Sequence, residues 1–383
     1  MSNVRRFSLA VATALAACAA IVPGAQATWS SASWTLPTTS SQLAGASCAS
    51  TTFCVLTGYQ SGGTPRGLSY KYNGTTYSSV VPAATTAELY NVTCTSTTFC
   101  MGVGTDYATS TPAPHAESFN GTSWTTVTSA TPTGATFTEL AGIACPSTTS
   151  CFAAGRFQKA SGTTPLVETY SGTSFSQTTV TPPTGTTNSQ LNAIACSATT
   201  ACTAVGGYDS ASPRTPLIFR YNGTTWATQT AAVPAGSTYT ELTGVACPSA
   251  TVCHAVGYYL DSLSAEHALA ETWNGTAWST RAVADPSGGQ DASLTGISCY
   301  STTGCEAVGS YTNSTNLNVE KLAAGWNGTA WSLQSDARPM SVTDAQLIGV
   351  GCVSSSFCRA VGVSNYDGTT GVTGLRPAID VGP

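Results

Sequence analysis

The sequence predicts an all-β protein built from seven copies of one unit, and three observations support this fold class. Fourteen of the 15 cysteines form seven C-x5-C pairs, whose first cysteines lie 46 to 53 residues apart. A second element, of the type Trp-Asn-Gly-Thr-Ala-Trp, follows each of the first six pairs. No stretch after residue 27 shows the period of an amphipathic helix. All-strand repeats of this length are typical of propeller blades.

Each unit is predicted to contain four short strands, and the fifth copy shows them well. The first strand, Leu242 to Cys247, alternates apolar with small or polar residues, and the second runs from Cys253 to Tyr258. The third strand, Ala268 to Trp273, leads into Asn274-Gly275, a strong signal for a type I′ hairpin turn with positive φ at both central residues. A fourth strand then covers Thr276 to Val283.

Seven such units predict a seven-bladed β-propeller with four antiparallel strands per blade. A β-helix is the alternative, but it has shorter repeats and lacks the hairpin turns. The last unit stops before any Asn-Gly-Thr element, whereas WSSASW at 29–34 precedes the first cysteine pair and aligns with WNGTAW at 273–278. We therefore expect the N-terminal strand near Trp34, in the place of Trp278, to complete the last blade. This closure leaves no exposed inner edge.

The N-terminus predicts an exported protein. Residues 1–27 combine Arg5-Arg6, an apolar stretch at 7–22 and an A-x-A cleavage site at Ala25-Gln26-Ala27, which together indicate a secretory signal peptide. The apolar stretch is too short to predict a transmembrane segment. The mature domain is expected to span residues 28–383. The alternative is a lipid anchor at Cys18, since Leu15-Ala16-Ala17-Cys18 resembles a bacterial lipobox.

An exported chain meets an oxidising environment, so the paired cysteines are predicted to form disulfides. Zinc sites favour C-x2-4-C spacing in sets of four ligands, which the C-x5-C pairs do not match. Two cysteines that flank a five-residue turn can face each other across a hairpin. Each such bond is expected to add roughly 2 kcal/mol of stability. The predicted disulfides are Cys48–Cys54, Cys94–Cys100, Cys145–Cys151, Cys196–Cys202, Cys247–Cys253, Cys299–Cys305 and Cys352–Cys358.

Composition limits the classes of partner. Charged residues make up 8% of the chain, with a net charge of −5, and three lysines cannot neutralise a nucleic-acid backbone. The surface is expected to be rich in Ser, Thr, Asn and Gly, which suits an extracellular setting. We expect a monomer without cofactor, metal or nucleic acid, whose partner is an extracellular glycan or protein ligand.

The topology of a propeller separates two faces. The cysteine hairpins and the Asn-Gly-Thr turns share one face, here named the disulfide face. The loops between the second and third strands of the blades share the other, the loop face, and these loops differ from copy to copy. Binding residues commonly lie on variable loops held by a rigid scaffold, and each of these loops begins near an aromatic residue. The aromatic rings could equally cap the hydrophobic cores of the blades. The predicted ligand-binding residues are Tyr59, Tyr107, Phe157, Tyr208, Asp209, Tyr258, Asp261, Tyr311 and Tyr366.

A polar residue opens each predicted first strand, and the seven would form a ring near one mouth of the channel. The ring could bind a cation or ligand, or its members could bond backbone groups between blades. They are Gln42, Glu88, Glu139, Gln190, Glu241, Ser293 and Gln346.

Other recurring residues favour structural interpretations. The tryptophans recur at fixed places in the repeats, which favours packing between blades over sugar stacking. His254 follows the second cysteine of its pair at a position that varies between copies, so we expect it to be exposed; His115 and His267 fall late in variable loops. No catalytic motif such as G-x-S-x-G or HExxH occurs.

The pattern L-x-G-[VI]-x-C-x-S-x-x-x-C-x-A-V-G with W-N-G-T-x-W resembles the repeats of secreted β-propeller-like proteins of actinobacteria, over essentially the whole chain after residue 27. The second element is also distantly similar to the Asp-box turn of sialidase-like propellers, S-x-D-x-G-x-T-W. It lacks the aspartate, and the arginine cluster and Tyr/Glu pair of sialidases cannot be placed, so the similarity does not extend to activity.

The function predicted from these patterns is a secreted, non-enzymatic binding module for glycans or cell-envelope polymers. The alternatives are an extracellular protein-interaction scaffold and an extracellular glycoside hydrolase or lyase, which would need an acid, a base and an arginine gathered at the channel mouth.

Overall fold

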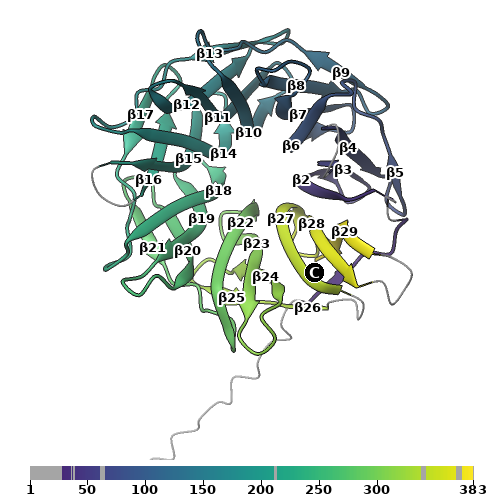
Figure 1. Cartoon of the computed structure of the whole chain (residues 1–383), viewed down its shortest axis with the longest axis vertical. Helices are drawn as coiled ribbons and strands as arrows, with labels where there is room; N and C mark the ends of the chain where they lie inside the picture. Colours follow the sequence, from purple (N-terminus) through teal and green to yellow (C-terminus); the bar gives the residue numbers. More distant parts are fainter. Residues whose placement is uncertain are drawn as a thin grey trace, which may run out of the picture.

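A computed structural model describes residues 28–35, 37, 39–60, 65–210, 214–337, 342–367 and 373–382. Seven sheets surround a central channel, with the first strand of each blade innermost (Figure 1); all described strand pairs are antiparallel except β1 with β26 in the last blade. The predicted seven-bladed β-propeller is therefore confirmed. No helix that is long and apolar enough to cross a membrane occurs in this described part. The predicted signal peptide and the alternative anchor Cys18 lie outside the described residues.

Blades 1 to 4 each contain four strands in consecutive order. Blade 1 comprises β2 (Ser41–Ser50), β3 (Phe53–Gln60), β4 (Gly67–Tyr72) and β5 (Tyr77–Ser79). Blade 2 comprises β6 (Ala87–Ser96), β7 (Phe99–Asp106), β8 (Ala113–Phe119) and β9 (Trp124–Val127). Blade 3 comprises β10 (Phe137–Ser147), β11 (Ser150–Lys159), β12 (Gly162–Tyr170) and β13 (Phe175–Thr178). Blade 4 comprises β14 (Asn188–Ala198), β15 (Ala201–Asp209), β16 (Thr215–Tyr221) and β17 (Trp226–Gln229).

Blades 5 and 6 repeat this order, and blade 7 departs from it. Blade 5 comprises β18 (Tyr239–Ser249), β19 (Val252–Leu260), β20 (Glu266–Trp273) and β21 (Trp278–Arg281). Blade 6 comprises β22 (Gly289–Ser301), β23 (Gly304–Asn313), β24 (Val319–Trp326) and β25 (Trp331–Leu333). Blade 7 comprises β27 (Val342–Ser354), β28 (Phe357–Asp367), β29 (Thr373–Val381), the N-terminal β1 (Thr28–Ser31) and β26 (Ser335–Ala337).

The N-terminal strand closes the ring, but Trp34 does not occupy the predicted place. Ser30 of β1 pairs with Val381 of β29, which puts Trp29 at the register position that Trp278 holds in blade 5. Trp29 is 1% exposed, and its ring occupies space that is free because residue 382 is a glycine. Trp34 instead lies edge-on to Tyr70 of blade 1, with ring centroids 4.9 Å apart. Both tryptophans fit the repeat pattern, and the prediction assigned Trp34 rather than Trp29 to the position of Trp278.

The seven predicted disulfides are all present, one in the hairpin between the first two strands of each blade. Their Cα atoms are 3.9 to 4.1 Å apart, the close spacing of facing residues in an antiparallel pair. The second cysteine of every pair is fully buried, whereas the first is partly exposed. Seven disulfides within one chain indicate an oxidising environment.

The Asn-Gly-Thr elements form the predicted hairpins but not the predicted turn type. In blade 1 Tyr72 pairs with Tyr77, which leaves a four-residue connection. Only the glycine has positive φ, +99° at Gly74, because the asparagine side chain stabilises the turn instead. Asn73 Oδ1 accepts the backbone N–H groups of Thr75 and Thr76, at 3.0 and 2.9 Å.

The tryptophans pack between blades, as the repeat pattern predicted. Each aromatic pair joins the end of a third strand to the start of a fourth, such as Trp326 and Trp331 with centroids 5.6 Å apart. The residue after the second cysteine packs against the pair of the following blade, and His254 lies 5.1 Å from Trp326 in this way. His254 is therefore buried, at 1% exposure, and the expectation that it is exposed was wrong. Strands inside a propeller are covered on both sides, so a variable position can still be buried.

Buried carboxylates attach the connections between blades. Glu117 of β8 is 0% exposed and accepts the backbone N–H groups of Ala83 and Ala84, both at 2.8 Å. His115 also lies in β8, buried, with its Nε2 2.9 Å from Glu117 Oε1, so it does not belong to a loop. Glu271 of β20 accepts the N–H of Ala232 at 3.0 Å in the same manner. These glutamates fix the connecting segments between blades, and neither side chain is accessible to solvent.

Candidate functional site

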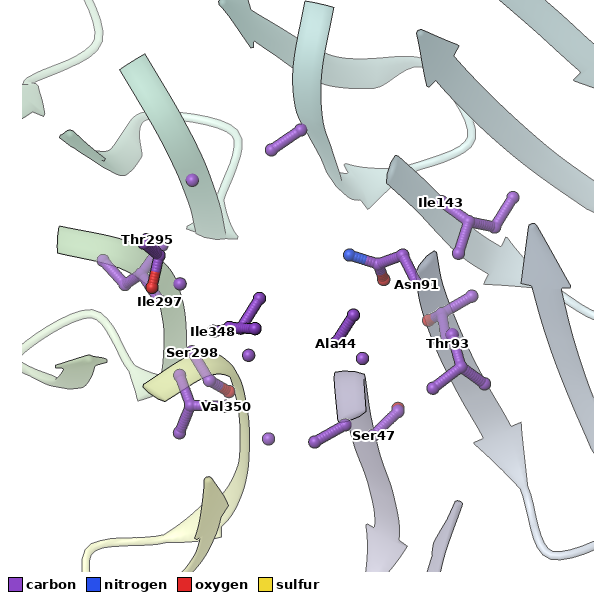
Figure 2. Close-up of a pocket in the computed structure, with 18 of the residues that line it drawn as sticks. Ala44, Ser47, Asn91, Thr93, Ile143, Thr295, Ile297, Ser298, Ile348 and Val350 are labelled. Atoms are coloured by element: carbon purple, nitrogen blue, oxygen red, sulfur yellow. The ribbon is translucent and has the colours of Figure 1, made fainter. Parts of the chain in front are cut away.

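The central channel contains a cavity of about 230 Å³, lined by the innermost strands of the blades. Its lining includes no charged and no aromatic residue. Five blades place glycine and blade 4 places alanine where the inner strands approach one another, and a Cβ at Gly142 would lie 2.9 Å from the Cα of Ala193 in the next blade. Blade 2 has Asn91 at this position, and its side chain is directed towards the middle of the channel (Figure 2). No hydrogen bond of that carboxamide occurs within the described part of the chain.

Polar side chains beside the cavity fasten neighbouring inner strands together. Thr243 Oγ1 donates to the carbonyl of Leu294 at 2.6 Å, one blade further on. Thr295 Oγ1 makes the equivalent bond to Leu347 at 2.8 Å. Asn192 Nδ2 donates to the carbonyl of Leu242 at 2.8 Å and in addition reaches a carboxylate at the loop-face mouth.

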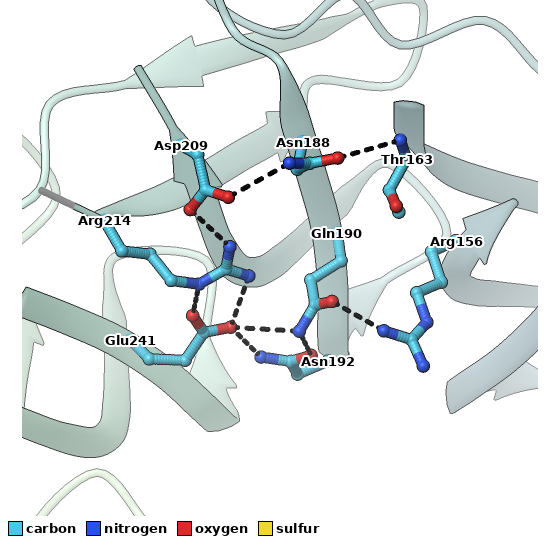
Figure 3. Close-up of polar contacts among 8 residues, drawn as sticks. All are labelled: Arg156, Thr163, Asn188, Gln190, Asn192, Asp209, Arg214 and Glu241. Carbon is cyan, nitrogen blue, oxygen red and sulfur yellow. Dashed lines mark hydrogen bonds and ion pairs between the residues drawn. The ribbon is translucent and has the colours of Figure 1, made fainter. Parts of the chain in front are cut away.

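An extended set of side chains, here named the arginine network, crosses this mouth from blade 3 to blade 5 (Figure 3). Arg156 donates to Gln190 at 2.9 Å and to Glu139 at 3.2 Å. Gln190 Nε2 donates in turn to Glu241 of the next blade, at 3.3 Å. The network comprises Glu139, Arg156, Gln190, Asn192, Asp209, Arg214 and Glu241.

Arg214 is the most enclosed cation of the arginine network, with its side chain 11% exposed. It forms a forked contact with Glu241 through Nε and Nη2, and donates Nη1 to Asp209 at 2.9 Å. Glycine at residue 207 leaves room for this contact, because a Cβ there would lie 2.4 Å from Glu241 Oε2 and would displace the carboxylate. Burial acts to lower the pKa of Arg214, but its bonds and charge interaction with Glu241 raise that pKa overall. The guanidinium is thus held charged and fully engaged.

A second group, the tyrosine cluster, occupies the same mouth on blades 1 and 2. Its members are Gln42, Tyr59, Glu88, Tyr90 and Tyr107. Tyr90 donates its hydroxyl to Glu88 Oε2 at 2.8 Å, so the 3.0 Å contact with Tyr107 has Tyr107 as the donor. Gln42 Nε2 donates to the Tyr59 hydroxyl, and the Tyr59 ring meets the Tyr90 ring edge-on at 5.5 Å.

The two groups are electrostatic neighbours. Burial raises the pKa of Tyr107, the charges of Glu88 and Glu139 raise it further, and Arg156 acts against them. Burial also raises the pKa of Glu88, and the charge of Glu139 adds to the effect while the bond from Tyr90 opposes it. The tyrosines therefore remain protonated at neutral pH, as donors and acceptors of hydrogen bonds.

The predicted aromatic residues of the loop face fall into two sets, according to the side of the strand on which each ring lies. Tyr59 and Tyr107 belong to the tyrosine cluster, and Tyr258 stacks on Tyr239 with centroids 5.7 Å apart. The rings packed against the hydrophobic cores between blades are those of Phe157, Tyr208 and Tyr311. Successive residues of a strand point to opposite sides of the sheet, so loop aromatics one position apart do not share a surface. The side chain of Tyr366 lies outside the described residues.

The two predicted acidic residues, Asp209 and Asp261, lie in different parts of the loop face. Asp209 belongs to the arginine network, whereas Asp261 lies at a loop of blade 5, 3.5 Å from the Nε2 of His267. His267 lies at the start of β20 rather than in a loop, 2.9 Å from Asp285, and the bond to Asp285 raises its pKa. No group of three or more His, Cys, Asp or Glu in the described part of the protein is arranged to hold a metal ion.

Of the predicted polar ring, five members gather in the two groups at the mouth: Gln42, Glu88, Glu139, Gln190 and Glu241. They bond mainly to side chains rather than to backbone groups.

Two residues of these groups, Tyr90 and Asn192, were not predicted from the sequence. Both occupy the position after the recurrent leucine, where other copies have Ala, Thr or Ile, and this departure from the repeat was the available signal.

Comparison with known proteins supports the fold alone. No protein-family model matches the chain, and no curated protein matches it. Among solved structures, a polysaccharide lyase of family PL25, an ulvan lyase bound to -[GlcA(1-4)Rha3S]-, has a TM-score of 0.57 at 8% identity over 90% of this chain and 95% of its own. YCF48 from Cyanidioschyzon merolae has a TM-score of 0.50 at 11% identity, covering 91% and 98%.

A third similar structure is a GH74 xyloglucanase from Xanthomonas campestris, with a TM-score of 0.50 at 9% identity, covering 88% of this chain and 59% of its own. These identities are too low to carry an activity across. The class that the structure defines is a seven-bladed β-propeller with one disulfide in each blade.

Proposed function

We propose that this protein is a secreted, non-enzymatic binding module that recognises glycans or cell-envelope polymers at the loop-face mouth of its channel. The observation that carries the proposal is the gathering, at one mouth, of partly exposed hydroxyl, carboxylate, amide and guanidinium groups from four neighbouring blades, together with the buried carboxylate of Glu241 from a fifth. Such a set donates and accepts hydrogen bonds over an extended surface, which matches a polyhydroxylated ligand.

The rigidity of the surrounding fold supports binding. The inner strands are joined to one another by bonds such as Thr243 to Leu294 and Thr295 to Leu347. The mouth groups are thus pre-organised, which lowers the entropy lost when a ligand binds. The tyrosines add flat apolar surface beside polar atoms, a combination suited to sugar rings. The seven disulfides and the expected signal peptide support an extracellular location.

The test is a glycan array together with pull-down of insoluble polysaccharides by the protein. Tyr107→Ala removes a mouth hydroxyl and ring, and is expected to weaken binding. Thr302→Ala alters an exposed residue of a cysteine hairpin on the disulfide face and serves as the matched control, with binding unchanged. Absence of any bound glycan, or equal binding by both variants, would contradict the proposal.

A second candidate, an extracellular glycoside hydrolase or lyase, is favoured by one observation: two carboxylates and an arginine lie near one another at the mouth. Arg156 is ion-paired with Glu139 at 3.2 Å, and the charge of Glu139 acts on Glu88. Burial raises the pKa of Glu88, as a general acid requires. Incubation with polysaccharides, followed by measurement of new reducing ends or unsaturated products, separates the candidates. Product formation that is lost in Glu88→Gln would replace the binding proposal with this one.

A further inference from the structure

We propose that the recognised ligand carries a free amino group, and that the carboxylate of Glu88 receives its ammonium. The ligand class is thus an amino-sugar glycan with unacetylated amines, rather than a uronate-bearing or sulfated polymer. This inference rests on the proposed function, because it specifies the ligand of the same mouth.

The cations at the mouth are already occupied. Arg214 contacts Glu241 and Asp209, and its side chain is 11% exposed. Arg156 is more accessible, at 34%, but its guanidinium bonds Gln190 at 2.9 Å and Glu139 at 3.2 Å. An anionic ligand at Arg156 would compete with Glu139 for the charge of the guanidinium and would lie close to other carboxylates of the mouth.

Further described cations on the loop side lie away from the inner strands. Arg66 precedes β4, Lys159 ends β11 and lies 4.9 Å over the Phe157 ring, and Arg376 lies in β29. None of the three forms a described contact with the arginine network or the tyrosine cluster. Among the described residues, each arginine at the mouth is therefore already paired with a carboxylate, which disfavours a sulfate or uronate.

Glu88 differs from its counterparts in the neighbouring blades. In blade 3, Glu139 pairs in register with Arg156, whereas in blade 2 the residue in register with Glu88 is Thr105. The described partner of the Glu88 carboxylate is the Tyr90 hydroxyl, and within the described ranges no basic side chain forms an ion pair with it. Glu139 therefore has an arginine partner in its own blade and Glu241 has one from blade 4, whereas Glu88 has none among the described residues.

The groups around Glu88 fit an ammonium better than a bare hydroxyl. An ammonium brings three N–H donors and a charge. The carboxylate of Glu88 supplies the opposite charge, and the Tyr107 hydroxyl, which donates to Tyr90, keeps its lone pairs for a further donor. The charge of Glu139 acts on this same region, so the local balance is negative. Four carboxylates face two guanidiniums across the mouth, namely Glu88, Glu139, Asp209 and Glu241 against Arg156 and Arg214.

The experiment compares short glucosamine oligomers with their N-acetylated counterparts and with oligogalacturonate of equal length, by isothermal titration calorimetry on the whole protein. We expect the amine form to bind about tenfold more tightly than the acetylated form, and the uronate form to bind weakest. Glu88→Gln keeps the acceptor for Tyr90 and removes the charge, and is expected to abolish the preference for the amine.

General attraction between a cationic ligand and an acidic protein is controlled by Asp291→Asn. Asp291 is exposed at φ +52°, which asparagine tolerates, and the substitution changes the net charge by the same amount as Glu88→Gln. Retention of the amine preference in Asp291→Asn and its loss in Glu88→Gln supports the inference. Equal losses in both variants, or tighter binding of the acetylated or uronate form, overturn it.

The two proposals fail in different ways. Glycan binding without preference for amines, with unchanged binding by Glu88→Gln, refutes only the amine site. Absence of binding to all three oligomers and to every glycan of the array refutes the proposed function as well.

Discussion

Replacing Glu271 by glutamine is predicted to stabilise the protein at pH 8 and to leave its stability at pH 5 nearly unchanged. Glu271 lies in β20, 0% exposed. One carboxylate oxygen accepts the N–H of Ala232 at 3.0 Å, and the other has no hydrogen-bond partner. Burial raises the pKa of Glu271 from 4.5 to about 7, although the bond from Ala232 opposes the shift.

The direction follows from proton linkage. Because the pKa of Glu271 is raised on folding, the folded state binds a proton more tightly than the unfolded state. The stabilising contribution is fully present below pH 4.5 and is lost as pH rises through about 7. The difference between these two pKa values corresponds to about 3 kcal/mol, most of which falls between pH 5 and pH 8. Glutamine mimics the protonated acid at every pH, so Glu271→Gln avoids this loss.

Urea unfolding followed by tryptophan fluorescence at both pH values measures the effect. At pH 8 the free energy of unfolding of Glu271→Gln should exceed that of the wild type by about 2–3 kcal/mol, whereas exposed Asp291→Asn should differ little. His254 acts in the opposite sense, since burial lowers its pKa to about 4 and its contribution is lost as pH falls through that value. The wild type and Glu271→Gln both contain His254, so its contribution cancels in the difference between their free energies of unfolding. A Glu271→Gln variant no more stable than the wild type at pH 8 would refute the reasoning.

Three further predictions concern a disulfide of the first blade, the buried Trp29 that closes the ring and a buried ion pair. Replacing Cys48 and Cys54 together by serine should lower the free energy of unfolding by about 2 kcal/mol, measured by urea titration, and an unchanged midpoint would count against the disulfide's role. Trp29→Ala should destabilise by about 3–5 kcal/mol because the ring is buried in the closing blade; a loss below about 1 kcal/mol would show that closure does not depend on it. Lys321→Met leaves the buried carboxylate of Asp380 without its 2.7 Å partner and should cost about 3–5 kcal/mol in thermal unfolding, whereas an unchanged melting temperature would contradict this.

Much of the fold was predictable because its signals are local and repeated. The cysteine spacing within a hairpin predicted all seven disulfides, and the Asn-Gly-Thr elements predicted the outer hairpins. The turn type was wrong because the side chain of Asn73 supplies bonds that backbone statistics do not include. The burial of His254 was wrong because it depends on the following blade, which places Trp326 against it.

The candidate site was only partly predictable for a similar reason. The ring of first-strand residues identified Glu88 and Glu241, but not which of them would have an arginine partner. Arg214 reaches Glu241 from the preceding blade, across a sequence separation of 27 residues, over the space left by Gly207. Such a contact depends on the angle between blades, and no local pattern reports that angle.

The sequence by itself determined the number of blades, the pairing of the cysteines and the face on which variation is concentrated, because each depends on residues close together in the chain. Only the tertiary structure decided that Trp29 closes the ring, that Arg156 and Arg214 are paired with carboxylates, and that Glu88 has no basic partner among the described residues. These features arise where different blades meet, and their energies depend on burial and charge separation in three dimensions.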